Sequence, residues 1–192
     1  MKNIFTFCVV LVAVAAMPAQ TPASTPAGSQ DGQSIPPVFQ KKAQAFADSR
    51  GHFVSHDYAK AETALLAGNQ AKAGTPQWHC ESGFSLMQMA FAFQAQSDAV
   101  TSSAIARLAL AHLQQADRAY GTGANASEIA TEKELTGFLC ENLLGDRNAA
   151  KTYYQAAVNL SPSTSGHAAE SLAAIVRTEK EETRKRSRAP GN

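Results

Sequence analysis

The sequence predicts an all-α fold. Apolar residues recur at helical spacing through most of the 192 residues, and no stretch alternates as a half-buried β-strand would. Alanine is abundant and aromatic residues make up only 7% of the chain, which suits closely packed helices better than a sheet. Short breakers separate the helical stretches, so consecutive helices should be antiparallel neighbours. We therefore expect a series of stacked helical hairpins.

Composition limits the size of the fold and the kind of partner. A hydrophobic content of 44% is enough for one domain with its own core. The formal net charge is only +1, so no overall field attracts a polyanion. No nucleic-acid partner is expected.

The amino-terminal residues predict export. Lys2 precedes an apolar run from Ile4 to Ala16 that ends in small residues, as in a secretory signal peptide, which we assign to residues 1–19. The run is shorter than the roughly 20 residues that span a bilayer comfortably. The alternative is an uncleaved anchor, and membrane association is expected only in that case. Residues 20–37 are rich in Pro, Ser, Thr and Ala and predict a flexible linker.

Breakers then delimit seven helices in a domain assigned to residues 38–186. They are Gly51, the Gly74–Pro76 turn, Ser97–Asp98, Gly121–Asn125, Gly145–Asp146 and Ser161–Gly166. Pro76 suits the first turn of a helix because its backbone angle is preset. The expected helices cover residues 36–50, 57–71, 77–96, 99–120, 127–144, 147–160 and 167–186, and residues 187–192 are expected to form a disordered basic tail.

The most regular helix is the one expected at 147–160. Ala150, Tyr154, Ala157 and Pro162 follow the pattern Ala-x3-Tyr-x2-Ala-x4-Pro, after a turn at Gly145. This resembles the second helix of a tetratricopeptide repeat. The two alanines would let the paired helix approach closely, Tyr154 would fill the space between hairpins, and Pro162 would end the helix.

Two further units can be drawn from the same spacing. Asp57, Ala61 and Leu65 repeat the spacing of Asp146, Ala150 and Tyr154. A third copy of Ala-x3-large-x2-Ala is assigned after Asp98, at Ala104, Leu108 and Ala111. The resemblance implies a tetratricopeptide-like α-solenoid of about three hairpins with a carboxyl-terminal capping helix.

The first helices depart from that family. Its Trp-x2-Leu-Gly-x2-Tyr pattern is represented only by Trp78 with Gly83 and by Gly137. Asp57, Asp98 and Asp146 are also unequally spaced. A degenerate helical solenoid or an irregular bundle is the alternative.

The cluster Trp78–Glu81, "WHCE", is the most tempting site for chemistry. Adjacent helical residues point about 100° apart, so His79 and Cys80 should not converge on one substrate or metal. We expect Trp78 to be packed and His79 to be exposed at a helix start.

The other histidines do not complete a site. His52 and His56 have a spacing of four residues that can hold a metal, but two imidazoles are an incomplete zinc site, and surface positions are expected. His112 on an apolar helix face is expected to be buried and hydrogen-bonded. The sequence therefore predicts no catalytic, metal-binding or cofactor-binding residue. The alternative is a small exported enzyme or metal-binding protein using His79 and Cys80 with His52 or His56.

Cys80 and Cys140 are expected to be free, mostly buried thiols. Aligning Asp98 with Asp146 makes Cys140 equivalent to Ala92 on the neighbouring first helix. That position lies about 18 Å along the axis from Cys80, beyond the reach of a disulfide.

The expected function is that of an exported, non-catalytic scaffold for protein–protein or peptide binding. The resemblance implies capture of a peptide or partner protein on the concave side, where the candidate contacts are Gln88, Phe91, Gln94 and Lys133. The helix that carries most of them is rich in Phe and Met, which also suits a central helix buried all round. A purely structural envelope component is a further alternative.

Overall fold

The computed structural model describes residues 36–121 and 124–188, and within these ranges every regular element is helical. The all-α class is thus confirmed. The signal peptide assigned to 1–19, the linker up to residue 35 and the end of the basic tail lie outside the described residues. Among the described helices, none is both long and apolar enough to cross a membrane.

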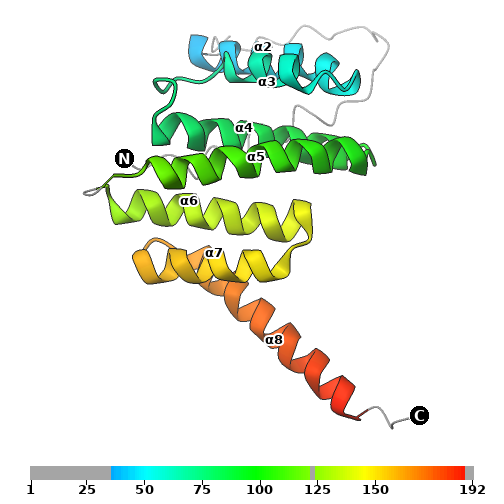
Figure 1. Ribbon diagram of the computed structural model, residues 1–192, viewed down its shortest axis with the longest axis vertical. Coiled ribbons are helices and arrows are strands. Elements are labelled where there is room, and N and C mark those ends of the chain that lie inside the picture. Colours follow the sequence, from blue (N-terminus) through cyan, green and yellow to red (C-terminus); the bar gives the residue numbers. More distant parts are fainter. Residues whose placement is uncertain (1–35, 122–123, 189–192) are drawn as a thin grey trace, which may run out of the picture.

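The helices pack in the order of the chain (Figure 1). Each of the first three pairs is a hairpin, α2 with α3, α4 with α5, and α6 with α7, while α8 packs chiefly on α7 and slants away from the stack. Their bounds are α2 (Pro37–Val54), α3 (Tyr58–Leu66), α4 (Pro76–Gln94), α5 (Ala99–Ala119), α6 (Ala126–Leu139), α7 (Arg147–Leu160) and α8 (Gly166–Arg188).

An aspartate caps the second helix of every hairpin. Asp57, Asp98 and Asp146 each precede the first helical residue, and each carboxylate accepts a backbone N–H three residues on, at 3.3, 3.0 and 2.9 Å. Each cap satisfies an amide that the helix itself leaves unpaired and contributes about 1 kcal/mol. The three aspartates chosen from spacing therefore do begin helices.

The second helices also share a burial pattern counted from that cap. The residues four, eight and eleven positions after each aspartate are buried in all three hairpins, although the last one of the first set lies just past the end of α3: Ala61, Leu65 and Gly68; Ser102, Ala106 and Ala109; Ala150, Tyr154 and Ala157. These positions face the neighbouring helices, so they set how closely each second helix approaches.

For α5, the fully buried residues lie two positions before those expected from sequence. Ala104 and Leu108 are only partly buried, although Leu108 packs against the core, and Ala111 is exposed, while Ser102 and Ala106 are buried. The helix carries alanine in both alignments, so composition alone could not distinguish them. Pro162 is exposed and follows the end of α7, as expected for a residue that terminates a helix.

The close contact between α6 and α7 depends on Gly137. A Cβ atom placed there would lie 2.7 Å from the ring of Tyr154, which is fully buried. Only a residue without a side chain fits at this point, and the aromatic ring fills the space that the glycine leaves.

The carboxyl-terminal turn of α6 is wider than the sequence predicts. After Leu139 the chain forms a π-helical turn, η2 (Cys140–Leu144), which ends at Gly145 in the left-handed conformation with φ of 66°. The amide of Asp146 then donates to the carbonyl of Cys140 at 2.9 Å. The turn accommodates one extra residue without breaking the helix.

Two other boundaries differ from expectation. α2 continues through Gly51 to Val54, because an exposed helical glycine weakens a helix without ending it. α3 stops at Leu66 instead of residue 71, because the following loop binds α4. There Asn69 donates to the Ser82 hydroxyl at 2.7 Å, and the amide of Gln70 donates to Glu81 at 2.9 Å.

The buried residues of the core form two clusters. The larger cluster surrounds α4, whose buried residues include Leu86, Met87, Met89, Ala90 and Phe93. A second cluster joins α7 to α8 through Tyr154 and Ile175. α4 is thus central, yet Phe84 and Phe91 on it stay only partly buried. At the carboxyl end, α8 reaches Arg188, so the first two residues of the expected tail are helical.

Candidate functional site

A row of partly buried rings crosses the side of the molecule formed by α2, α4 and α6. It runs from Phe46 on α2 through Phe84 and Phe91 on α4 to Phe138 on α6. The rings of Phe91 and Phe138 are 5.8 Å apart, and His167 at the start of α8 continues the row 5.8 Å from Phe138. The row therefore links all three hairpins and α8 along one surface.

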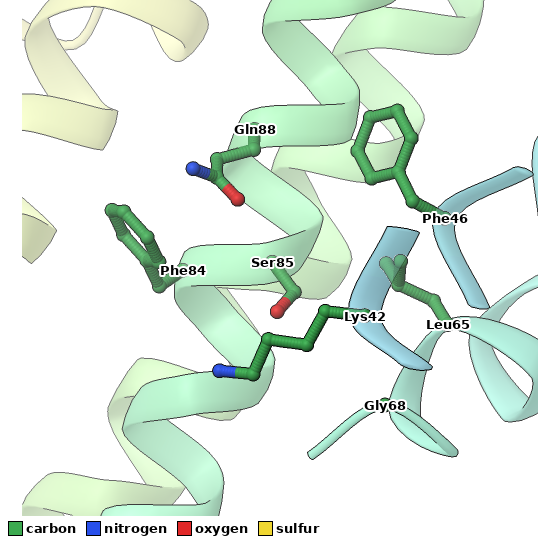
Figure 2. A pocket seen from close by; sticks show the side chains of 7 residues that line it. All are labelled: Lys42, Phe46, Leu65, Gly68, Phe84, Ser85 and Gln88. Atoms are coloured by element: carbon green, nitrogen blue, oxygen red, sulfur yellow. The ribbon is translucent and has the colours of Figure 1, made fainter. Parts of the chain in front are cut away.

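A small cavity lies at the amino-terminal part of this row (Figure 2). It measures about 50 Å³. Its walls come from α2, from α3 with the loop that follows it, and from α4: Lys42 and Phe46; Leu65 and Gly68; Phe84, Ser85 and Gln88. A cavity of about 150 Å³ holds benzene, so this one has room for only a few carbon atoms.

The polar side chains around the cavity are available to a ligand. Within the described part of the chain, neither the Ser85 hydroxyl nor the Gln88 amide hydrogen-bonds another group. The ammonium of Lys42 lies 4.0 Å from Glu81, a partly exposed and long ion pair. An apolar recess with unused hydrogen-bonding groups at its edge is the usual composition of a small binding site.

The four contact residues proposed from sequence do not share one surface. Gln88 lines the cavity and Phe91 belongs to the row of rings. Gln94 is exposed at the end of α4, where its amide reaches the carbonyl of Asn142 at 3.5 Å.

Lys133 is placed elsewhere, which corrects its assignment as a contact. Its side chain is only 12% exposed and its ammonium pairs with Asp117 of α5 and, at 3.5 Å, with Glu132. The same ammonium lies 5.6 Å from the centre of the Tyr153 ring on α7. Lys133 therefore points toward the second helices and joins three elements instead of facing a ligand.

A second cluster of functional side chains links α3, α4 and α5. The Nδ1 atoms of His79 and His112 are 3.1 Å apart, and Nε2 of His112 lies 2.8 Å from the carboxylate of Glu62. Trp78 covers the pair, with its ring centre 4.9 Å from His79 and 5.3 Å from His112. His112 is 8% exposed and bonded at both nitrogens, so its expected burial is confirmed.

His79 is not exposed as expected, because it is partly buried against His112. Burial, and after it the nearby His112, lower the pKa of His79. The imidazole is therefore neutral at pH 7. The partners are separated by 33 and 50 residues along the chain, and no local sequence pattern reports such a pairing.

Cys80 and Cys140 are both free, as expected. The thiol of Cys80 is partly buried 3.5 Å from the Tyr120 hydroxyl, and Cys140 is fully buried at the start of η2. Burial raises the pKa of each thiol to about 11. Both are thus protonated and poorly nucleophilic at neutral pH.

The structure does not bring the other candidate ligands to His79. His52 lines an open depression between α2 and α3, together with Lys60 and Thr63, and His56 lies 3.1 Å from the Tyr58 hydroxyl. Cys80 faces Tyr120 and not a histidine. In residues 36–121 and 124–188, no group of three or more His, Cys, Asp or Glu side chains is arranged to hold a metal ion.

Two buried acids on α6 were not recognised from sequence. Glu132 accepts the Thr136 hydroxyl at 2.8 Å, while its second oxygen makes no hydrogen bond and lies 3.5 Å from the Lys133 ammonium. Glu134 lies at the amino-terminal end of α8, near His167 and the amide of Ala168. Burial raises the pKa of both carboxyls. Alternating charges along a helix ordinarily indicate a solvent-exposed face, so nothing in the sequence indicated that these two acids are buried.

Comparison of the chain with models of known protein families, with characterised proteins and with solved structures finds no match. The functional proposals therefore rest on the geometry of the row of rings with its cavity and of the cluster formed by Glu62, His112 and His79.

Proposed function

We propose that this chain is an exported, non-catalytic scaffold of tetratricopeptide-like hairpins that binds an extended segment of a partner protein. The binding surface is the row of rings on α2, α4 and α6, with the cavity beside Gln88 as its anchor point. The apolar run near the amino terminus supports export.

The hairpins support the scaffold part of the proposal. In each, an aspartate begins the second helix, and buried residues follow at the same three offsets. A repeated set of packing positions in successive hairpins is typical of repeat proteins, which carry long binding surfaces on their first helices.

The single observation that carries the binding part is the cavity with its unused polar groups. The recess accepts a small aliphatic side chain, and Ser85 and Gln88 can hydrogen-bond a peptide backbone beside it. The rings of Phe46 and Phe84, which line the recess, offer apolar contact from α2 and α4. Partly exposed aromatic rings around a recess are frequent anchors in protein interfaces.

Site-specific photo-crosslinking tests the proposal in the native host. A photoreactive phenylalanine analogue at Gln88 should crosslink one protein reproducibly, whereas the same analogue at Gln115, which is exposed on α5, should not. Equal labelling from both positions, or none from Gln88, contradicts the proposed surface.

The crosslinked segment, made as a synthetic peptide, then gives a quantitative test. Gln88→Ala should weaken its binding about tenfold, because a hydrogen bond across an interface is worth about 1 to 1.5 kcal/mol. Gln115→Ala should leave the affinity unchanged. Circular dichroism of both variants checks that the fold is intact.

A further inference from the structure

Glu62, His112 and His79 form a series of hydrogen bonds that crosses the boundary between two hairpins. Glu62 belongs to α3 and so to the first hairpin, while His112 and His79 belong to α5 and α4 of the second. Its two contacts, at 2.8 and 3.1 Å, therefore tie one layer of the molecule to the next. This cluster is separate from the surface proposed for the partner.

The number of protons on these three side chains decides whether the two hydrogen bonds between them can form. When both imidazoles are neutral, Nε2–H of His112 donates to Glu62, and Nδ1 of His112 accepts from Nδ1–H of His79. One added proton is tolerated: His112 then donates at both nitrogens, and His79 changes tautomer so that its Nδ1 accepts. A second proton puts hydrogen on both facing Nδ1 atoms, and neither remains an acceptor.

We propose that Glu62, His112 and His79 form a proton-sensitive clasp between the first two hairpins. The clasp is closed while at least one of the two facing Nδ1 atoms lacks a proton. It opens when both carry one, because two imidazolium rings then face each other 3.1 Å apart.

The surrounding charges do not compensate the second proton. From α3, Glu62 neutralises one positive charge. On α4, Glu81 is already bound by the Gln70 amide and faces Lys42. On α5, no acid contacts the pair in the described chain, and Trp78 adds only an aromatic face. The lowered pKa of His79 agrees with surroundings that oppose the addition of a second proton.

Opening should loosen the first hairpin without unfolding the molecule. Ala61 and Leu65 remain buried in the core, and Asn69 still holds the loop after α3 to α4. Hydrogen exchange of the α3 amides should therefore accelerate relative to that of the α7 amides in the same sample, after correction for the intrinsic effect of pH.

A pH titration in the presence of EDTA tests the clasp. EDTA prevents a divalent cation from bridging the two Nδ1 atoms. Histidine ring resonances report each protonation, and the fluorescence of Trp78, the single tryptophan of the chain, reports the environment of the pair. We expect His79 to titrate below the ordinary range of an imidazole, and the α3 exchange to accelerate at the same midpoint.

Three variants separate the clasp from a general effect of acid. His79→Gln cannot take the second proton, so the acid-induced step should disappear. Glu62→Gln keeps an acceptor for His112 but loses the compensating charge, so opening should shift upward by about one pH unit. His52→Gln, outside the cluster, should behave as the wild type.

The proposal is overturned if His79 titrates in the ordinary range of an imidazole, or if α3 and α7 respond equally to acid. It is also overturned if Glu62→Gln shifts the step downward. Because Gln can accept the same hydrogen bond, Glu62→Gln should fold even if a variant at His79 does not, and the test remains decisive.

Discussion

Gly137 and Gly51 are both helical glycines, but their surroundings differ. A Cβ at Gly137 would overlap the buried ring of Tyr154, whereas a Cβ at Gly51 would meet nothing within 4 Å. Gly137→Ala should lower the free energy of unfolding by about 1 to 3 kcal/mol, because the core around Tyr154 has no room to adjust. Gly51→Ala should raise it by about 0.5 to 1 kcal/mol through helix propensity.

Urea denaturation of both glycine variants tests whether the free energy of unfolding falls in Gly137→Ala and rises in Gly51→Ala. If Gly137→Ala were as stable as the wild type, the close approach of α6 and α7 at Tyr154 would be wrong. Gly51→Ala is the matched control, since it introduces the same methyl group in a helix.

Glu132 predicts an unusual dependence of stability on pH. Its pKa is raised by burial, so the folded protein holds this proton more tightly than the unfolded chain does. The carboxyl therefore contributes stability below its unfolded pKa near 4.5, and that contribution is lost as pH rises through the folded value. Glu132→Gln, which can still accept the Thr136 hydroxyl, should be more stable than the wild type at pH 7.

The difference between Glu132→Gln and the wild type should vanish near pH 4. Thermal melts of the two proteins across this range measure it. A Gln variant less stable at pH 7 would mean that the ion pair with Lys133, at 3.5 Å, outweighs the cost of burying the charge.

For single residues, the sequence predicted the role correctly where that role depends on neighbours within the same helix. The three capping aspartates could be identified because a cap acts within one turn of its own helix. The pairing of His79 with His112 could not, since it depends on how α4 lies on α5. Lys133 was misplaced for the same reason: its spacing is compatible with either side of α6, and only Asp117 and Tyr153 decide between them.

At the level of elements, η2 explains how α6 meets α7. The π-helical turn absorbs one residue between Gly137 and Ala150, both of which face the interface of the two helices. Deleting the exposed Asn142 should convert this turn to ordinary α-helix and cost no more than about 2 kcal/mol.

A deletion in a regular helix supplies the comparison. Gln155 is equally exposed on α7, but removing it would rotate Ala157 by about 100° away from Tyr154. We expect that variant to lose more than about 4 kcal/mol or to remain unfolded. Circular dichroism melts compare the two, and similar losses from both deletions would contradict a bulge that absorbs one residue.

The extent of the helices was largely predictable, but their internal alignment was less so. Breakers placed most ends within a few residues, because Gly, Pro and Asp act on the backbone locally. Alanines at 104, 106, 109 and 111 allow two alignments of α5, and tertiary packing selects the one that buries 106 and 109. Likewise, nothing in the residues 140–144 signals that the last turn of α6 widens.

For the whole molecule, α8 covers an apolar surface that α7 cannot bury alone. Ala168 and Ile175 are buried against the cluster around Tyr154, whereas residues 180–187 are all exposed. Ending the chain after Ser165 should therefore cost about 3 kcal/mol or more, because that cluster becomes exposed.

Ending the chain after Glu179 is the matched truncation. It removes the ion pair between Arg147 and Glu182, whose partners are about half exposed, and should cost less than about 1 kcal/mol. Denaturation midpoints of the two truncations test this. Equal losses would mean that the projecting part of α8 has contacts of its own.

The projection of α8 also has a mechanical consequence. Residues 180–188 form a straight helical arm of about 13 Å that leaves the stack, while the base of the helix rests chiefly on α7. A load applied at the carboxyl terminus acts through this arm and concentrates on the contacts of Ile175 and Lys151 with their partners. α8 should therefore peel away at low force, while the three hairpins behind it keep their structure.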